Sequence, residues 1–92
     1  MNFEYYITGQ QLVYGQAKMF AAFAAHDGKQ DWRFPTGNES YEIAQYFREI
    51  DHELAGQPIW DASMQFTTDM EMIEQPWYNW NLILVRDKNV DD

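Results

Sequence analysis

The spacing of apolar residues predicts a strand and then a helix in the first part of the chain. The run 3–7, Phe-Glu-Tyr-Tyr-Ile, is rich in aromatic and β-branched residues, which favour a strand. A helix is predicted over 12–25, with Thr8 as N-cap and Gln11 at the spacing of a capping box. Its many apolar side chains indicate burial over a broad face. Residues 31–34 are expected to form a short strand or an extended loop.

The second helix has the clearest pattern in the chain. Its N-cap is predicted at Asn38 or Ser40, and Gly56 is expected to end it shortly before Pro58. Four apolar residues recur at the spacing i, i+4, i+7 and i+11, which places them on one stripe of a helix. They are Ile43, Phe47, Ile50 and Leu54.

Beyond Pro58 the pattern changes to the period of two that is typical of strands. Polar and apolar residues alternate over 60–67, which predicts one half-buried strand, and the alternation continues at Met70 and Met72. A last strand is expected over 77–85, followed by a frayed polar tail, 86–92. This order predicts an α+β fold, an antiparallel sheet with two helices packed on one face, in a single domain of residues 1–92.

Composition favours a folded domain and excludes several classes of protein. The chain is 46% hydrophobic and 17% aromatic, which is enough to form a core. It contains no cysteine, so disulfides and thiolate metal sites are excluded. The amino terminus lacks the basic and apolar regions of a signal peptide, and the longest apolar run, 19–25, is too short to span a bilayer. We therefore expect an intracellular protein.

Acidic residues are concentrated in the middle of the chain. The net charge is −9, and residues 39–74 contribute −8 of it, because this segment contains nine carboxylates and one basic residue, Arg48. Such a surface repels nucleic acid and anionic membranes, so a basic protein is the expected partner. The nine candidate partner-binding residues are Glu39, Glu42, Glu49, Asp51, Glu53, Asp61, Asp69, Glu71 and Glu74.

Three of these carboxylates are expected to form a row along the second helix. Glu42, Glu49 and Glu53 follow at i, i+7 and i+11, which spans about 16 Å of helix axis. Phosphates follow one another at about 3.4 Å of rise along a DNA strand, so the row could overlie several of them. Asp69 and Glu71 would add a second pair on a strand. The alternative is an acidic domain whose charge serves only solubility.

The chain as a whole resembles the Arn family of antirestriction proteins of T-even phages. The resemblance lies in its size, the opening 1–6, the absence of cysteine and the acid-rich middle. It implies a DNA mimic in the host cytoplasm that inhibits a restriction endonuclease of the McrBC type. DNA mimics can also occupy histone-like nucleoid proteins. The alternative function is an acidic adaptor that binds a host protein without imitating DNA.

The residue types used in catalysis occur here without the spacing that catalysis requires. His26 and His52 are the only imidazoles, and adjacent helix positions diverge by about 100°, so His52 and its acidic neighbours cannot converge on a metal ion. Ser40 and Ser63 lack the sequence context of a nucleophile elbow. We therefore expect neither an enzyme nor a bound cofactor or metal.

Aromatic residues gather near the carboxyl end of the chain. Trp77, Tyr78 and Trp80 follow Pro76 closely. Core packing at an edge strand is the favoured interpretation of this cluster. Its alternative is a homodimer contact, since tryptophan and tyrosine are enriched at protein interfaces.

Overall fold

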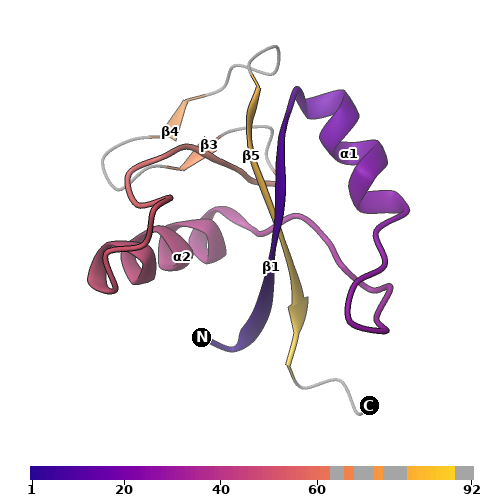
Figure 1. Cartoon of the computed structure of the whole chain (residues 1–92), viewed down its shortest axis with the longest axis horizontal. Coiled ribbons are helices and arrows are strands. Elements are labelled where there is room, and N and C mark those ends of the chain that lie inside the picture. Colours follow the sequence, from indigo (N-terminus) through magenta and orange to yellow (C-terminus); the bar gives the residue numbers. More distant parts are fainter. Residues whose placement is uncertain (63–65, 68–71, 74–78, 89–92) are drawn as a thin grey trace.

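The computed structural model describes residues 1–62, 66–67, 72–73 and 79–88, and it confirms the α+β class in one small domain. The described strands form one sheet in the order β1-β5-β2-β3-β4 (Figure 1). The helices are α1, Tyr14–Ala22, and α2, Gly37–Glu49. The strands are β1, Phe3–Leu12; β2, Ile59–Trp60; β3, Phe66–Thr67; β4, Met72–Ile73; and β5, Trp80–Asp87.

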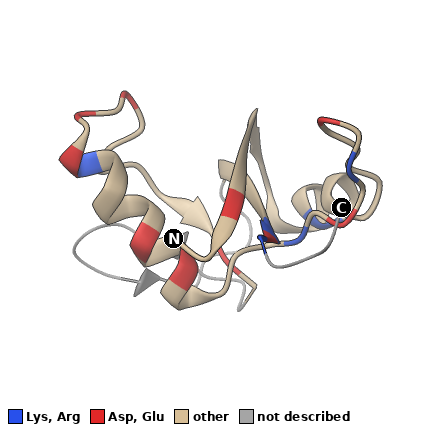
Figure 2. Cartoon of the chain, turned by 90° about the horizontal axis from the view of Figure 1, so that it is seen from below, with Lys and Arg blue, Asp and Glu red and all other residues tan. Residues whose placement is uncertain are grey.

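The helices lie on opposite faces of the sheet (Figures 1 and 2), which corrects the prediction of two helices on one face. Leu82 and Leu84 of β5 pack with Ala17 of α1 in one core cluster. The residues of β5 that alternate with these leucines, Ile83 and Val85, pack on the other face, in a second cluster with Ile43 and Phe47 of α2. The uninterrupted apolar run of β5 explains this arrangement, because a strand with both sides apolar requires cover on both faces.

The sheet is mixed, which corrects the prediction of purely antiparallel pairing. β1 pairs antiparallel with β5, but β2 runs parallel to β5 through the pair Ile59 and Asn81. The single strand predicted over 60–67 is two short strands, since Trp60 of β2 pairs antiparallel with Phe66 of β3. The extended segment expected over 31–34 is confirmed, because Arg33 forms a backbone bridge to Val85.

The first strand continues past the residues that were predicted to cap α1. The register between β1 and β5 shifts between Ile7 and Gln11, at a bulge where Gly9 has a φ of 75°. Thr8 donates its hydroxyl to the Leu82 carbonyl at 2.7 Å, so it holds the strand instead of capping a helix. The N-cap position of α1 falls on Val13, which provides no side-chain hydrogen bond. The capping-box prediction at Thr8 was therefore wrong.

Helix α2 begins and ends earlier than the sequence indicated. Thr36 is its N-cap, because the Thr36 hydroxyl accepts from the Glu39 amide while the Glu39 carboxylate accepts from the Thr36 amide. Asn38 and Ser40, the predicted caps, are residues of the helix itself. The helix ends at Glu49 and Asp51 adopts a positive φ of 56°. The amides of Asp51 and the next residue then bond back to the last turn, as in a Schellman motif.

Two arginines tie the edges of the central strands to neighbouring segments. Arg86 is 3% exposed within β5 and binds Glu4 of β1 and Asp31 of the following segment, so it does not belong to a frayed tail. Arg33 binds both carboxylate oxygens of Glu39, at 2.7 and 2.9 Å, and also reaches Asp87. Of the predicted tail, residues 89–92 lie outside the described part of the chain.

The Arg33–Glu39 pair predicts a pH-dependent contribution to stability. Its hydrogen bonds lower the pKa of Glu39, so the stabilisation is present at neutral pH and is lost as the pH falls below the unfolded pKa through the folded one. Glu39→Gln should lower the free energy of unfolding by about 1 kcal/mol at neutral pH, and by less at pH of about 3. Urea unfolding at both pH values measures this. Glu42→Gln, a change at an exposed helix position, is the matched control.

Replacement by alanine should have opposite effects at two glycines, one in the bulge of β1 and one in α1. Gly9→Ala should destabilise the protein by about 1 kcal/mol, because its positive φ disfavours any side chain. Gly15→Ala should instead stabilise α1 by about 0.5 to 1 kcal/mol, since a methyl group there meets open space on a helix. Thermal unfolding of both variants tests the pair. Equal shifts of the same sign would contradict the assignment of the bulge.

Candidate acidic interface

Four of the predicted carboxylates lie exposed along α2 and the loop that follows it. We call them the α2 acidic face: Glu42, Glu49, Asp51 and Glu53. Figure 2 shows acidic segments along this helix and its loop, whereas the basic segments lie mostly toward α1. Within the part of the chain that the structure describes, none of the four forms an ion pair with another residue. Their charges are therefore exposed to solvent.

Two members of the α2 acidic face are held in register by the helix. Glu42 and Glu49 are seven residues apart, which is about two turns, so they lie on the same side about 10 Å apart along the axis. Together with Gln45, Tyr46 and Met1 they line a shallow hollow of about 290 Å³. The two carboxylates thus border a concave surface that a long side chain of a partner can enter.

The carboxyl end of α2 adds to the negative potential of this surface. Peptide dipoles leave roughly half a negative charge at a helix C-terminus, which makes acidic side chains unfavourable there. Glu49 is nevertheless the last residue of the helix, and Asp51 and Glu53 follow directly. Arg48 in the last turn offsets part of this cost, but three carboxylates still lie at or just beyond the negative end of the helix.

The row of carboxylates predicted from the sequence is shorter than expected. Because α2 ends at Glu49, Glu53 does not continue the helical row, and the predicted span of about 16 Å along one helix was wrong. Glu53 instead lines a hollow of about 230 Å³ beside the β1 bulge, together with Gln10 and Asn81. The α2 acidic face is therefore built from a helix and a turn.

Two of the other predicted carboxylates are held within the fold, one by an ion pair and one by burial. Glu39 is bound by Arg33 and by the Thr36 amide, and only 19% of its side chain is exposed. Asp61 is fully buried next to β2. Neither carboxylate therefore belongs to the α2 acidic face. The last three predicted residues, Asp69, Glu71 and Glu74, lie outside the described residues.

Both imidazole rings have structural contacts. His52 accepts a hydrogen bond from the Leu54 amide at 3.0 Å and stacks on Phe47, with 4.2 Å between the ring centroids. His26 stacks in the same way on Tyr6, with 3.8 Å between the centroids. In the described ranges, no group of three or more histidine or acidic side chains is placed to hold a metal ion.

The predicted aromatic contact is partly an element of the core. Trp80 is buried at 6% exposure, and its ring packs on Trp60 with 4.3 Å between the centroids. It is therefore excluded as a homodimer contact, and core packing is the correct interpretation for this residue. Trp77 and Tyr78 lie outside the described residues.

An apolar surface on α1 is the feature that sequence reasoning missed. Of α1, only Ala17 is buried, whereas Met19 is 67% exposed and Phe23, directly after the helix, is 83% exposed. The prediction of broad burial was therefore wrong. The spacing contained a signal, because Ala17, Phe20 and Ala24 form one stripe of a helix and Met19 and Phe23 form another.

None of the helices in the described ranges combines the length and the apolar character needed to cross a lipid bilayer. No family model matches the chain, and no curated protein or solved structure matches it. The family resemblance stays a prediction.

Proposed function

We propose that this protein is a DNA mimic, an inhibitor that occupies the DNA-binding site of a basic host protein. The targets proposed are a restriction endonuclease of the McrBC type or a histone-like nucleoid protein, both in the host cytoplasm. The observation that carries the proposal is the α2 acidic face, a set of exposed carboxylates on one side of a domain with a net charge of −9. It is a binding function without catalysis.

The spacing of the helical carboxylates supports this proposal. Glu42 and Glu49 lie about 10 Å apart along the helix axis. Three steps of a DNA strand rise by a similar distance, about 10 Å at about 3.4 Å per step. Asp51 and Glu53 extend the same negative surface beyond the helix. A protein groove lined by lysine and arginine would therefore meet carboxylates where it normally meets phosphates.

The exposure of these side chains also favours binding driven by charge. Exposed carboxylates retain their water until a partner arrives, and complementary charge accelerates the encounter and selects the partner. The same charge repels nucleic acid and anionic membranes, so a basic protein surface remains the fitting partner. An adaptor that binds a host protein without imitating DNA is the competing function. It differs in one property, because it would leave the DNA site of its partner open.

The first functional prediction concerns the α2 acidic face. Glu42→Gln combined with Glu49→Gln should weaken binding to a purified histone-like nucleoid protein, or to the DNA-recognising domain of an McrBC-type endonuclease, about tenfold. Calorimetric titration measures this. The control combines Asp27→Asn with Gln30→Lys, two exposed positions on the α1 side that change the net charge by the same amount.

The two variants separate a specific surface from bulk charge. Equal binding by the Glu42→Gln, Glu49→Gln variant and the wild type would exclude α2 as the mimic surface. Equal weakening in the control variant would mean that net charge alone drives association. All four positions are exposed, and none of their side chains forms an ion pair in the described part of the chain. Both variants should therefore keep the unfolding temperature of the wild type within a few degrees.

The second functional prediction distinguishes the mimic from the adaptor. A labelled duplex bound to the same target should be displaced by this protein, because both occupy one site. The affinity of the target for this protein should fall as salt is raised, but less steeply than its affinity for DNA, since a folded protein releases fewer condensed counterions. Less protein should therefore be needed to displace the duplex at the higher salt concentration. Fluorescence anisotropy at two salt concentrations measures both effects. A stable ternary complex of target, duplex and protein would favour the adaptor.

A further inference from the structure

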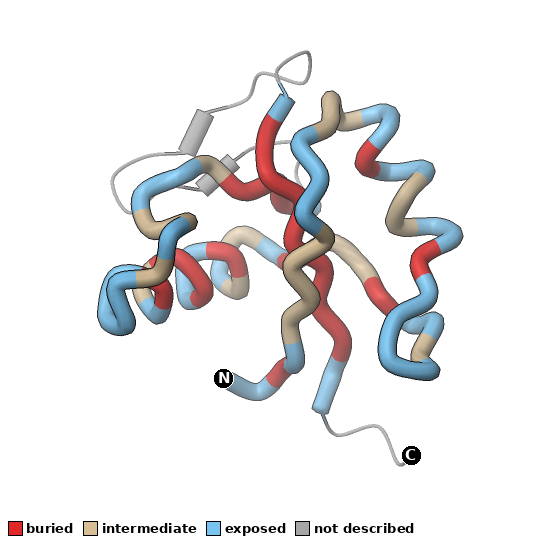
Figure 3. The backbone as a smooth tube through the Cα atoms, in the orientation of Figure 1, coloured by how far each residue is buried: buried red, intermediate tan, exposed pale blue. Residues whose placement is uncertain are grey.

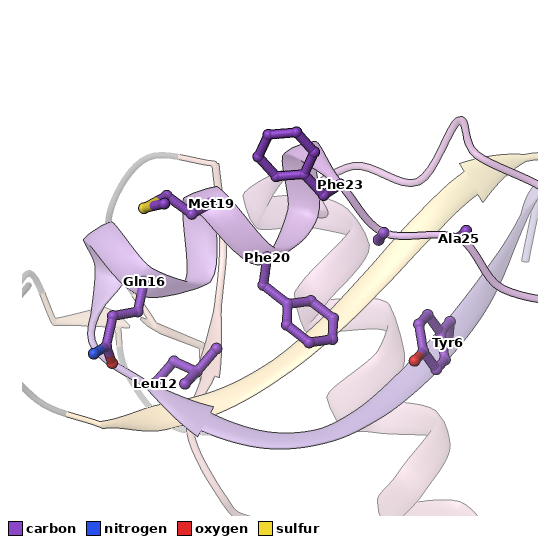
Figure 4. Close-up of a pocket in the computed structure, with 8 residues that line it drawn as sticks. Tyr6, Leu12, Gln16, Met19, Phe20, Phe23 and Ala25 are labelled. Carbon is purple, nitrogen blue, oxygen red and sulfur yellow. The ribbon is translucent and has the colours of Figure 1, made fainter.

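An open apolar groove lies between α1 and β1 (Figure 4). It is on the side of the molecule away from α2. Its volume is about 640 Å³. We call it the α1 apolar groove, and the side chains that define it here are Tyr6, Leu12, Met19, Phe20 and Phe23. An exposed apolar surface of this kind on a small domain marks a site of interaction, because isolated proteins usually bury such residues.

The groove has projecting and recessed parts side by side. Met19 and Phe23 stand on the outer side of α1 and are 67% and 83% exposed, whereas Phe20 points from the helix toward β1 (Figure 4). Leu12 and Tyr6, both partly buried, line the recessed part. A surface that carries both a projection and a matching hollow can be complementary to itself. Self-complementarity is the requirement for a symmetric contact between two identical chains.

The distribution of charge also favours a second copy of this chain as the occupant of the groove. The groove is lined by no charged side chain among the described residues, and α1 itself carries only Lys18. The opposite side of the molecule carries the four carboxylates of the α2 acidic face. Two copies of a chain with a net charge of −9 repel each other least where carboxylates are absent. A basic partner, by contrast, is attracted to the acidic side.

We propose that a second copy of this chain docks on the α1 apolar groove, with Met19 and Phe23 of each copy entering the hollow of the other. The resulting homodimer uses α1 in place of the aromatic cluster near Pro76. Because α1 and α2 cover opposite faces of the sheet, the two α2 acidic faces point outward in this dimer. If the α2 acidic face imitates DNA, as the proposed function requires, the dimer displays two such surfaces. This consequence alone rests on the proposed function.

The size of the groove and the charge of the chain determine how the dimer responds to conditions. Stable interfaces bury about 800 Å² on each partner, and a contact centred on one short helix is at the small end of that range, so we expect a micromolar Kd. Salt screens the repulsion between the copies while leaving apolar contacts intact, so added salt should strengthen the dimer. Binding of a basic target weakens under the same change. The two proposals therefore fail in distinguishable ways.

Sedimentation equilibrium from about 5 to 500 µM tests the dimer, over the range in which micromolar complexes dissociate. The wild type should pass from monomer to dimer over this range, and Phe23→Glu should remain a monomer. Gln30→Glu is the matched control, since it adds the same charge at an exposed position outside the groove and should dimerise with a Kd within about threefold of the wild type.

A second pair of variants removes the charge from the test and guards against misfolding. Phe23→Ala should raise the Kd of the dimer at least tenfold, whereas Ile50→Ala, an exposed apolar residue on the α2 side, should leave it unchanged. A monomeric wild type at about 500 µM would overturn the proposal and leave the groove to a helix of another protein. A dimer that persists in both Phe23 variants would overturn it as well.

Discussion

The fold depends on one strand that has no polar side. Residues 82–85 of β5 are apolar without interruption, and each is at most 1% exposed. Figure 3 shows most of this strand in the colour of buried residues. Successive side chains of a strand point to opposite faces, so this run must be covered from both sides. Helix α1 covers Leu82 and Leu84, and α2 covers Ile83 and Val85. The two helices can therefore present different outer surfaces, one apolar and one acidic.

The ion pairs of the fold decide which carboxylates remain available. Arg33 and Arg86 bind four acidic side chains that come from β1, α2, β5 and the segment before Trp32: Glu39 and Asp87, and Glu4 and Asp31. These pairs join segments up to 82 residues apart in the chain and hold the edges of the central strands together. Of the exposed acidic side chains that remain without an ion pair in the described residues, four lie on α2 and its loop, and Asp27 lies in the turn after α1. Because these ion pairs neutralise carboxylates elsewhere, the exposed negative surface is smaller and more localised than the sequence of the acidic middle suggests.

Both outer surfaces depart from what stability alone would favour. Carboxylates gather at the negative end of the α2 dipole, and Met19 and Phe23 expose large apolar side chains to water. Departures from local rules of this kind are expected where a surface serves a partner instead of the fold. The sheet separates the two surfaces, so that one outer side of the molecule is apolar and the other is acidic. An apolar contact on α1 can therefore form without hiding the α2 carboxylates.

The pattern of residues along the chain predicts the local features of this protein, whereas their arrangement depends on contacts between distant segments. The α+β class, the helix around Ile43 and Phe47, the extended segment at Arg33 and the acidic middle all follow from periodicity and charge within a few residues. The strand role of Thr8, the end of α2 at Glu49, the burial of Asp61 and the exposure of Phe23 do not. Each depends on a partner far away in the chain or on the backbone conformation of a turn. A local pattern indicates which residues prefer water and which prefer a core, but only the assembled sheet determines which of them are buried.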